Sequence, residues 1–177
     1  MDTIAERAGS TKPTLYAHFG DKDALYRAVL ARESAALGTW VTTAYQAAAG
    51  LGVEDQIRVY VMALFNYATK NPVSFRLLFT SPIEGEIARP RLELVALITQ
   101  SVADQVRRYL ADHGRTAGPS AELLAVLMVT MVGQAAEWTA TTEGVDPLAA
   151  GNLACGLIIA AVPGLDPGLL DAIDGRG

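Results

Sequence analysis

Hydrophobic positions recur at helical spacing along nearly the whole chain. Ile4, Ala5 and Ala8 fall on one helical face, and Leu15 and Phe19 fall on another, because residues three or four apart lie on the same side of a helix. The same spacing recurs over residues 21–49, 53–70, 73–80, 92–113, 120–142, 147–162 and 166–173. Since no segment alternates apolar and polar residues as a half-buried strand does, the sequence predicts an all-α fold.

Glycine, proline and capping residues predict where these helices begin and end. Gly9 and Gly20 close the first two helices, since glycine adopts the backbone conformation that ends a helix. Ser120 is predicted to cap the helix over residues 120–142. Residues 81–90 contain two prolines and a glycine, a composition that predicts a loop.

The first 32 residues predict a helix-turn-helix unit. Two short helices meet at a turn containing Gly9, and the second has Thr11 as its expected N-cap and Leu15 and Phe19 on its inner face. Its outer face carries cationic, hydroxylic and aromatic groups: Lys12, Thr14, Tyr16 and His18. In this arrangement the second helix enters the major groove of DNA.

The order and spacing of residues in this unit resemble the signature of the TetR family of bacterial transcriptional regulators. The similar positions are Ile4, Ala5, Ala8, Gly9, Thr11, Lys12, Pro13, Thr14, Leu15, Tyr16, His18, Phe19, Asp21, Lys22, Asp23 and Leu25. The resemblance implies that Thr11, Lys12, Thr14, Tyr16 and His18 lie on or just after the recognition helix. It also implies that Lys22 contacts a DNA phosphate.

The length of 177 residues suits a helix-turn-helix DNA-binding domain at residues 1–35 and a helical ligand-binding and dimerisation domain at residues 36–177. The TetR family has a further helix before the motif, and a branched apolar residue where this chain has Ser10. Ile4, Leu15 and Phe19 need a third helix to cover them. We therefore expect that Met1 is not the N-terminus of the functional regulator, or else that this chain binds DNA poorly.

Charge and composition limit the kinds of partner that this chain can bind. The first 32 residues carry five basic and four acidic groups, whereas the remainder carries nine basic and fifteen acidic groups, so only the first part is suited to binding phosphate.

Cys155 is the only cysteine and lies in an apolar run, which indicates a buried thiol in a reducing cytoplasm. No signal peptide is apparent. The longest apolar run, residues 123–133, is shorter than the ~18–20 residues of a membrane span, so we expect a cytoplasmic protein without a membrane partner.

The sequence offers no catalytic or metal-binding pattern. His18 and His113 are the only histidines, and Cys155 is remote from both, so no metal-ligand spacing or nucleophile-base set is present. Glu84 and Glu86 lie in the predicted loop without an acid or base partner. We therefore expect no enzymatic activity, no metal and no cofactor.

The larger domain is expected to hold a small-molecule effector. In the TetR family an apolar cavity among these helices binds such a molecule, and aromatic, methionine and isolated polar side chains predict its lining here. The predicted ligand contacts are Tyr60, Phe65, Phe75, Phe79, Met131, Gln134, Glu137 and Trp138. Each of these residues has an alternative interpretation as an ordinary core residue.

The two last long helices predict a homodimer. Residues 120–142 and 147–162 are too apolar to face water, and Gly133, Ala136, Gly151 and Gly156 would let a second copy approach closely. The sequence thus predicts a regulator that binds double-stranded operator DNA, most simply a repressor released by a small apolar or aromatic effector. The alternative is a helical ligand-binding or protein-interaction dimer without DNA binding.

Overall fold

The computed structural model describes residues 1–79 and 84–176, and every regular element in these ranges is helical. In chain order the elements are α1 (Asp2–Arg7), α2 (Lys12–Phe19), α3 (Lys22–Ala48), α4 (Val53–Lys70), α5 (Pro72–Phe79), the 3-10 helix η1 (Gly85–Ala88), α6 (Arg89–Asp112), α7 (Pro119–Thr141), α8 (Pro147–Ala161), the 3-10 helix η2 (Val162–Gly164) and α9 (Pro167–Ile173). The predicted all-α fold is therefore confirmed.

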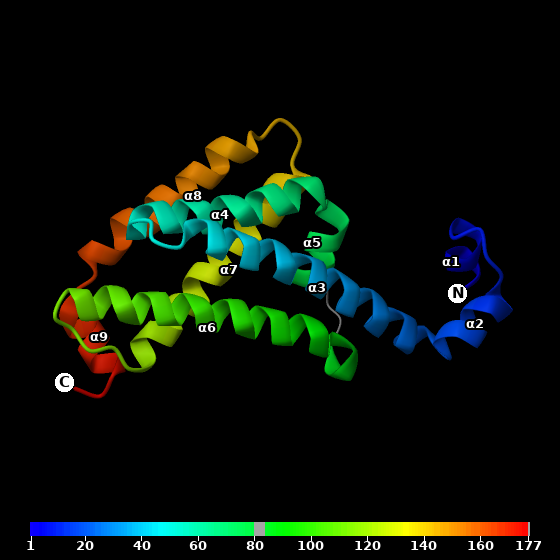
Figure 1. Cartoon of the computed structure of the whole chain (residues 1–177), viewed down its shortest axis with the longest axis horizontal. Coiled ribbons are helices and arrows are strands. Elements are labelled where there is room, and N and C mark those ends of the chain that lie inside the picture. Colours follow the sequence, from blue (N-terminus) through cyan, green and yellow to red (C-terminus); the bar gives the residue numbers. More distant parts are fainter. Residues whose placement is uncertain (80–83, 177) are drawn as a thin grey trace.

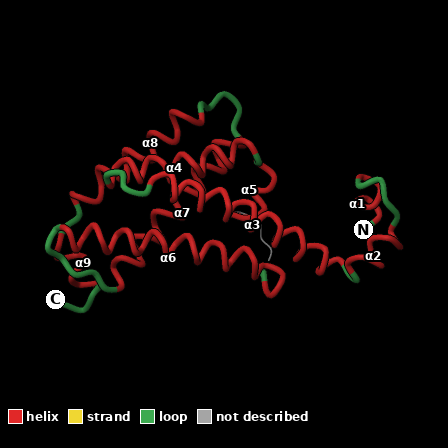
Figure 2. Tube along the Cα trace, viewed as in Figure 1, coloured by secondary structure: helices red, strands yellow, loops and turns green. Residues whose placement is uncertain are grey.

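The helices form two regions joined by one long rod. Helices α1 and α2 lie at the N-terminal end of α3, apart from the bundle that α4 to α9 build around the rest of α3 (Figures 1 and 2). Asp21 caps α3 by accepting a hydrogen bond from the Ala24 N–H at 2.6 Å. The expected boundary between residues 35 and 36 falls inside this continuous helix.

Helix α3 is anchored in the bundle from Leu30 onward. Leu30 and Leu37 are fully buried, and the Trp40 indole N–H donates to the Ala63 carbonyl of α4 at 2.9 Å. Lys70 lies over the same indole ring, 5.1 Å from its centroid. These contacts fix the bundle end of the rod, while the end that carries α1 and α2 projects outward (Figure 1).

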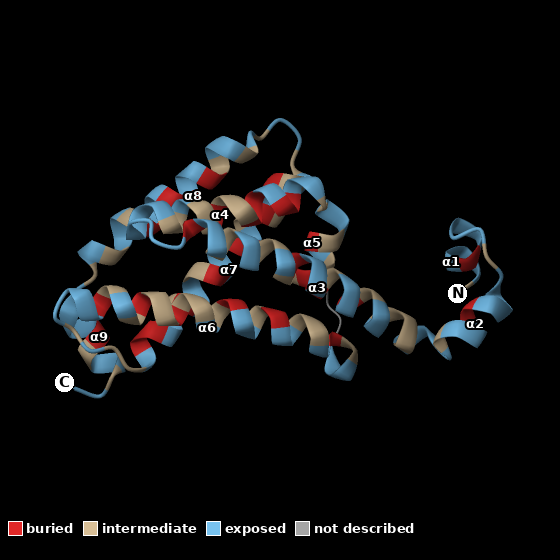
Figure 3. Ribbon diagram, in the orientation of Figure 1, coloured by how far each residue is buried: buried red, intermediate tan, exposed pale blue. Residues whose placement is uncertain are grey.

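A smaller buried cluster joins α6, α7 and α9, and the main core lies among α3 to α8. Phe65 and Phe75, which are 1% and 0% exposed, are the largest of its fully buried side chains. Around them pack buried residues of α3, α4, α5, α6, α7 and α8, shown as the red stripes facing inward in Figure 3. Burial of each such side chain contributes roughly 1.5–3 kcal/mol, so this core stabilises the larger domain.

Glycines on α7 and α8 pack within one protomer. A Cβ added at Gly133 would lie 2.7 Å from a ring carbon of Phe79, and one at Gly151 would lie 2.5 Å from the Met62 sulfur. Ala136 is also buried, at 1% exposure. The prediction that Gly133 and Gly151 serve close approach of a second copy is wrong, because side chains of α5 and α4 of the same chain already occupy that space; a Cβ at Gly156, by contrast, meets no atom within 4 Å.

Two predicted helix starts are also wrong. Helix α7 begins one residue before Ser120, with Gly118 as its N-cap and Pro119 in its first turn. Within the predicted loop 81–90, η1 forms at Gly85–Ala88 and α6 begins at Arg89, because a proline in the first turn of a helix lacks only an N–H that would have no partner there. Residues 80–83 of the predicted helix end and loop lie outside the described residues.

Two segments have the length and composition of a membrane span: α7 and residues Pro147–Gly164. The expectation that the apolar runs are too short does not hold, since single polar residues interrupt these segments without making them polar on average. The core helix of a soluble protein passes the same test. Only 33% of the α7 window and 22% of the other are buried in this fold, so both helices expose apolar surface.

Candidate functional site

The turn between α1 and α2 places the second helix of the helix-turn-helix unit. Gly9 has a φ of 60°, a backbone conformation that glycine adopts without strain. Thr11 caps α2 by accepting from the Thr14 N–H at 3.3 Å, and Pro13 lies in the first turn. The predicted cap and turn are both confirmed.

Helix α2 has one covered face and one exposed surface. Leu15 is buried and Phe19 is half-buried, whereas Lys12, Thr14, Tyr16 and His18 are exposed. The side chains of Thr11 and Thr14 share a hydrogen bond of 2.7 Å. The structure therefore brings the predicted DNA-contacting residues of α2 together on the solvent side of this helix.

Two cations flank this surface. The Lys12 ammonium forms an ion pair with Asp2 at 3.0 Å, a hydrogen bond that raises the pKa of Lys12 and lowers that of Asp2. Lys22 lies at the start of α3, 5.7 Å from the centroid of the Tyr26 ring. Since both lysines are exposed, each ammonium is accessible to a phosphate.

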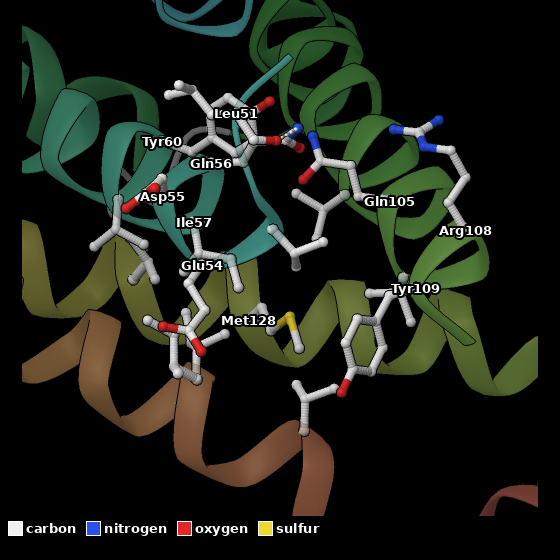
Figure 4. Close-up of a pocket in the computed structure, with 18 of the residues that line it drawn as sticks. Leu51, Glu54, Asp55, Gln56, Ile57, Tyr60, Gln105, Arg108, Tyr109 and Met128 are labelled. Carbon is white, nitrogen blue, oxygen red and sulfur yellow. Dashed lines mark hydrogen bonds between the residues drawn. The ribbon is translucent and has the colours of Figure 1, made fainter. Parts of the chain in front are cut away.

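A second site is a cavity of about 910 Å³ in the larger domain. Helices α3, α4, α6, α7 and α8 all contribute to its wall, as does the turn before α4 (Figure 4). Aliphatic side chains form most of the surface, among them Val41, Leu64, Ile98, Val132 and Ile158. Its volume lies in the range of pockets that enclose small organic ligands.

Polar groups of the cavity come mainly from three helices. The rings of Tyr45 on α3 and Tyr60 on α4 pack with centroids 4.2 Å apart. Gln105 and Tyr109 extend from α6 (Figure 4). Burial raises the pKa of Tyr45 to about 12 and also raises that of Tyr60, so both phenols are neutral at physiological pH.

Of the eight residues predicted as ligand contacts, Tyr60 is the one that lines this cavity. Phe65 and Phe75 lie in the core, and Phe79 stacks on Phe75 at 4.3 Å. Phe79 and Gln134 border a separate hollow of about 220 Å³ between α5, α6 and α7. Met131 and Trp138 are exposed, at 38% and 56%, and Glu137 is partly exposed.

The discrepancy has a simple geometric cause. Helix α7 is apolar on nearly every side, and its cavity-facing residues are Met128, Val129 and Val132, so the helical period alone does not separate an inner from an outer face. Gln105 is a polar residue between apolar positions of α6, and this signal was available in the sequence. Tyr45 lies on α3, and no residue of this helix is among the predicted ligand contacts.

Other reactive side chains occupy structural positions. Cys155 is fully buried on α8, and burial raises the pKa of its thiol, which disfavours the reactive thiolate. The His113 ring shares a 2.7 Å hydrogen bond with the Tyr109 carbonyl at the end of α6. Across the described residues, no group of three or more histidine, cysteine, aspartate or glutamate side chains is arranged to hold a metal ion.

Residues 1–29, which contain the helix-turn-helix unit, match the family described as bacterial regulatory proteins, tetR family. A relative supports the match: the chain is 30% identical over 148 residues to the HTH-type transcriptional activator FasR of Mycolicibacterium smegmatis (strain ATCC 700084 / mc(2)155). Both comparisons support assignment of the chain to the TetR family. That alignment covers 82% of this chain and 65% of the relative, so the chain spans less than two thirds of the relative's length.

The fold also agrees with a solved structure. A TetR-like transcriptional regulator from Rhodococcus sp. RHA1 superposes with a TM-score of 0.77, covering 93% of this chain and 84% of that one. Sequence identity between the two is 22%. At this identity the comparison supports the TetR-like architecture of the chain.

Proposed function

We propose that this chain is a TetR-family transcriptional regulator that binds operator DNA through α2. The observation that carries the proposal is the exposed surface of α2, where Lys12, Thr14, Tyr16 and His18 lie together on a helix that follows a tight turn. Lysine and hydroxyl groups bind phosphates, and side chains on a helix in the major groove contact base edges. Thr11 and Lys22 complete the proposed DNA-contacting set.

Selection of duplexes from a random pool tests this proposal. The expected result is enrichment of one sequence motif, followed by measurement of its affinity with fluorescence anisotropy at fixed salt. Tyr16→Phe is then expected to weaken binding of the selected duplex without altering thermal stability, because its hydroxyl is exposed. If no motif is enriched, the chain is better described as a helical ligand-binding or protein-interaction dimer without DNA binding.

We further propose that the regulator acts as a two-fold dimer. Large apolar side chains remain exposed on α7 and α8: Leu123, Val126, Leu127, Met131, Trp138, Leu148, Leu153 and Leu157. An apolar surface of this extent on a soluble protein marks an interface. A two-fold axis there would present two copies of α2, matching operator half-sites roughly 34–36 Å apart.

The 910 Å³ cavity supports an effector-controlled regulator. Its wall includes Val41, Ala44 and Tyr45 of α3, and the same helix leads directly to α2 (Figure 1). A ligand that displaces this end of α3 therefore acts on the position of the recognition helix. We propose that a small apolar or aromatic effector lowers operator affinity in this way and so releases a repressor.

Calorimetric titration of a bound compound, with and without operator DNA, tests the coupling. A tenfold loss of operator affinity requires about 1.4 kcal/mol of coupling, and linkage requires operator DNA to weaken the compound tenfold as well. Equal affinities in the two titrations would contradict the mechanism. The relative's name makes an activator the second candidate, and transcription in vitro separates the two, since added protein lowers transcript yield for a repressor and raises it for an activator.

A further inference from the structure

The two phenols of the cavity are unusual among its polar groups. Tyr45 and Tyr60 lie within an otherwise mostly aliphatic wall, with their rings in contact at 4.2 Å and tilted by 56°. Among the described residues, neither hydroxyl forms a hydrogen bond with another protein group. Both tyrosines are partly buried, and a tyrosine hydroxyl can donate and accept a hydrogen bond, so this pair retains an unused capacity to bind a ligand group.

Gln56, the neighbouring polar residue on α4, already has a hydrogen-bond partner. The Gln56 side chain donates to the Leu51 carbonyl at 2.9 Å, which holds the turn before α4 against the cavity rim. Across from it, Gln105 reaches from α6 toward Gln56 and Tyr60 (Figure 4). Uncommitted hydrogen-bonding groups thus lie on both sides of the same part of the cavity.

Charged groups are confined to exposed positions around the cavity. The charged lining residues are Glu54, Asp55, Arg108 and Asp112, and all four are exposed. Three of them are acidic and one is basic, so these side chains do not form a binding site for an ion of one charge. An ionised ligand group carried into the aliphatic interior would lose its hydration without gaining a buried counter-charge, and that loss strongly disfavours binding.

Resting on the proposed effector function, we propose that the cavity selects an uncharged molecule with an apolar ring system and one hydrogen-bond-accepting oxygen. The Tyr45 and Tyr60 hydroxyl groups donate to that oxygen, and Gln105 supplies a further amide donor. The ring system packs against the aliphatic wall and the tyrosine faces. This assignment makes the tyrosine pair the specificity-determining element of the site.

Four naphthalenes that differ in one substituent test the assignment: 2-acetylnaphthalene, 2-ethylnaphthalene, 2-naphthoate and 2-naphthylmethylammonium. Affinities are measured by isothermal titration calorimetry at pH 7 on the full chain without DNA. The neutral ketone is expected to bind roughly three- to tenfold more tightly than the matched hydrocarbon, the range that a net hydrogen bond provides. The anion and the cation are each expected to bind at least roughly tenfold more weakly than the ketone.

Three variants separate the hydroxyl groups from the shape of the cavity. Tyr45→Phe and Tyr60→Phe keep the rings, and together they are expected to abolish the preference for the ketone over the hydrocarbon. Tyr26→Phe removes a phenol outside the cavity, beside Lys22, and is expected to leave that preference unchanged. Circular dichroism melting confirms that each variant is folded.

Several outcomes would overturn the assignment: tighter binding of either ion, equal binding of ketone and hydrocarbon, a preference that survives in the double variant, or no binding of any member of the series. These measurements involve no DNA. Failure of the proposed operator binding would therefore leave them intact, and their failure would leave operator binding intact.

Discussion

The Asp174 carboxylate accepts hydrogen bonds at the N-terminus of α7, although α7 begins at Pro119, far earlier in the sequence. It accepts hydrogen bonds from the Ser120 N–H at 2.8 Å and from the Ser120 hydroxyl at 3.0 Å, and also from the Gly118 N–H at 3.0 Å. Its side chain is 1% exposed. Because the first N–H groups of a helix have no partner within the helix, Asp174 stabilises α7 and holds α9 against the connection between α6 and α7.

Asp174→Asn is therefore expected to lower the thermal midpoint and to speed amide hydrogen exchange in α9 and the first turn of α7. The amide retains the shape of the side chain but carries one acceptor oxygen in place of two. Asp171→Asn is the matched control, since Asp171 forms only ion pairs of 3.3 and 3.7 Å with Arg176 and Arg115. Equal effects of the two variants would show that the cap is unimportant.

The same carboxylate predicts an acid-dependent loss of stability. Burial alone would raise the pKa of Asp174, but hydrogen bonds from Ser120 and Gly118 outweigh it and lower the pKa below 3.8. A lowered folded-state pKa contributes stability above the unfolded value, and this contribution is lost as the pH falls through the folded value. The difference in urea midpoint between parent and Asp174→Asn should therefore be large at pH 6 and shrink below pH ~3.8.

Gly133→Ala is expected to lower the free energy of unfolding by up to about 2 kcal/mol. The new Cβ would lie 2.7 Å from a carbon of the Phe79 ring, which stacks on Phe75. Overpacking of this kind costs about 1–3 kcal/mol, and the ~1 kcal/mol that alanine gains over glycine in a helix offsets part of it. Gly38→Ala is the control, because its Cβ would make an ordinary 3.6 Å contact. Urea titration should show the control to be slightly stabilised, and a stabilised Gly133→Ala would contradict the clash.

Local signals made most of the fold predictable. Helix α4 ends before Pro72, and α2 begins at the Thr11 cap, because capping and proline geometry depend on residues a few positions apart. Ser120 shows where this reasoning stops. Its side chain resembles an N-cap in sequence, but its real role is to donate to Asp174, a partner that only tertiary structure brings near.

The two candidate sites differ in the same way. The surface of α2 follows from one short helix with a covered face at Leu15, so its exposed residues could be predicted from spacing. The cavity is assembled from five helices, and its position depends on which side of α7 faces inward. Met128 lines the cavity whereas Met131 is 38% exposed, although both are methionines of the same apolar helix.

Lys12→Ala is expected to weaken operator binding and to reduce the slope of log affinity against log salt by about 1. One lysine-phosphate contact releases roughly 0.9 counterions, and the Lys12 ammonium is exposed beside Asp2. Lys70→Ala provides the control, since Lys70 lies over Trp40 in the bundle. Anisotropy titrations at several salt concentrations measure both slopes, and an unchanged slope for Lys12→Ala would remove Lys12 from the phosphate contacts.

The proposed dimer predicts that Gly156→Arg is monomeric. Gly156 is exposed on α8, and a side chain added there meets no atom within 4 Å, so a single protomer accommodates the arginine. In a two-fold interface the substitution buries two unpaired cations, a cost of several kcal/mol. Leu97→Arg is the control, because Leu97 is 64% exposed on α6, outside the proposed interface.

Analytical ultracentrifugation at a concentration where the parent is dimeric should give monomers for Gly156→Arg and dimers for Leu97→Arg. Unaltered far-ultraviolet circular dichroism would show that both variants are folded. The opposite pattern would place the interface on α6. Since a two-fold operator is bound by two copies of α2 at once, the monomeric variant should also lose affinity for a palindromic duplex while binding an isolated half-site as tightly as the parent protomer does.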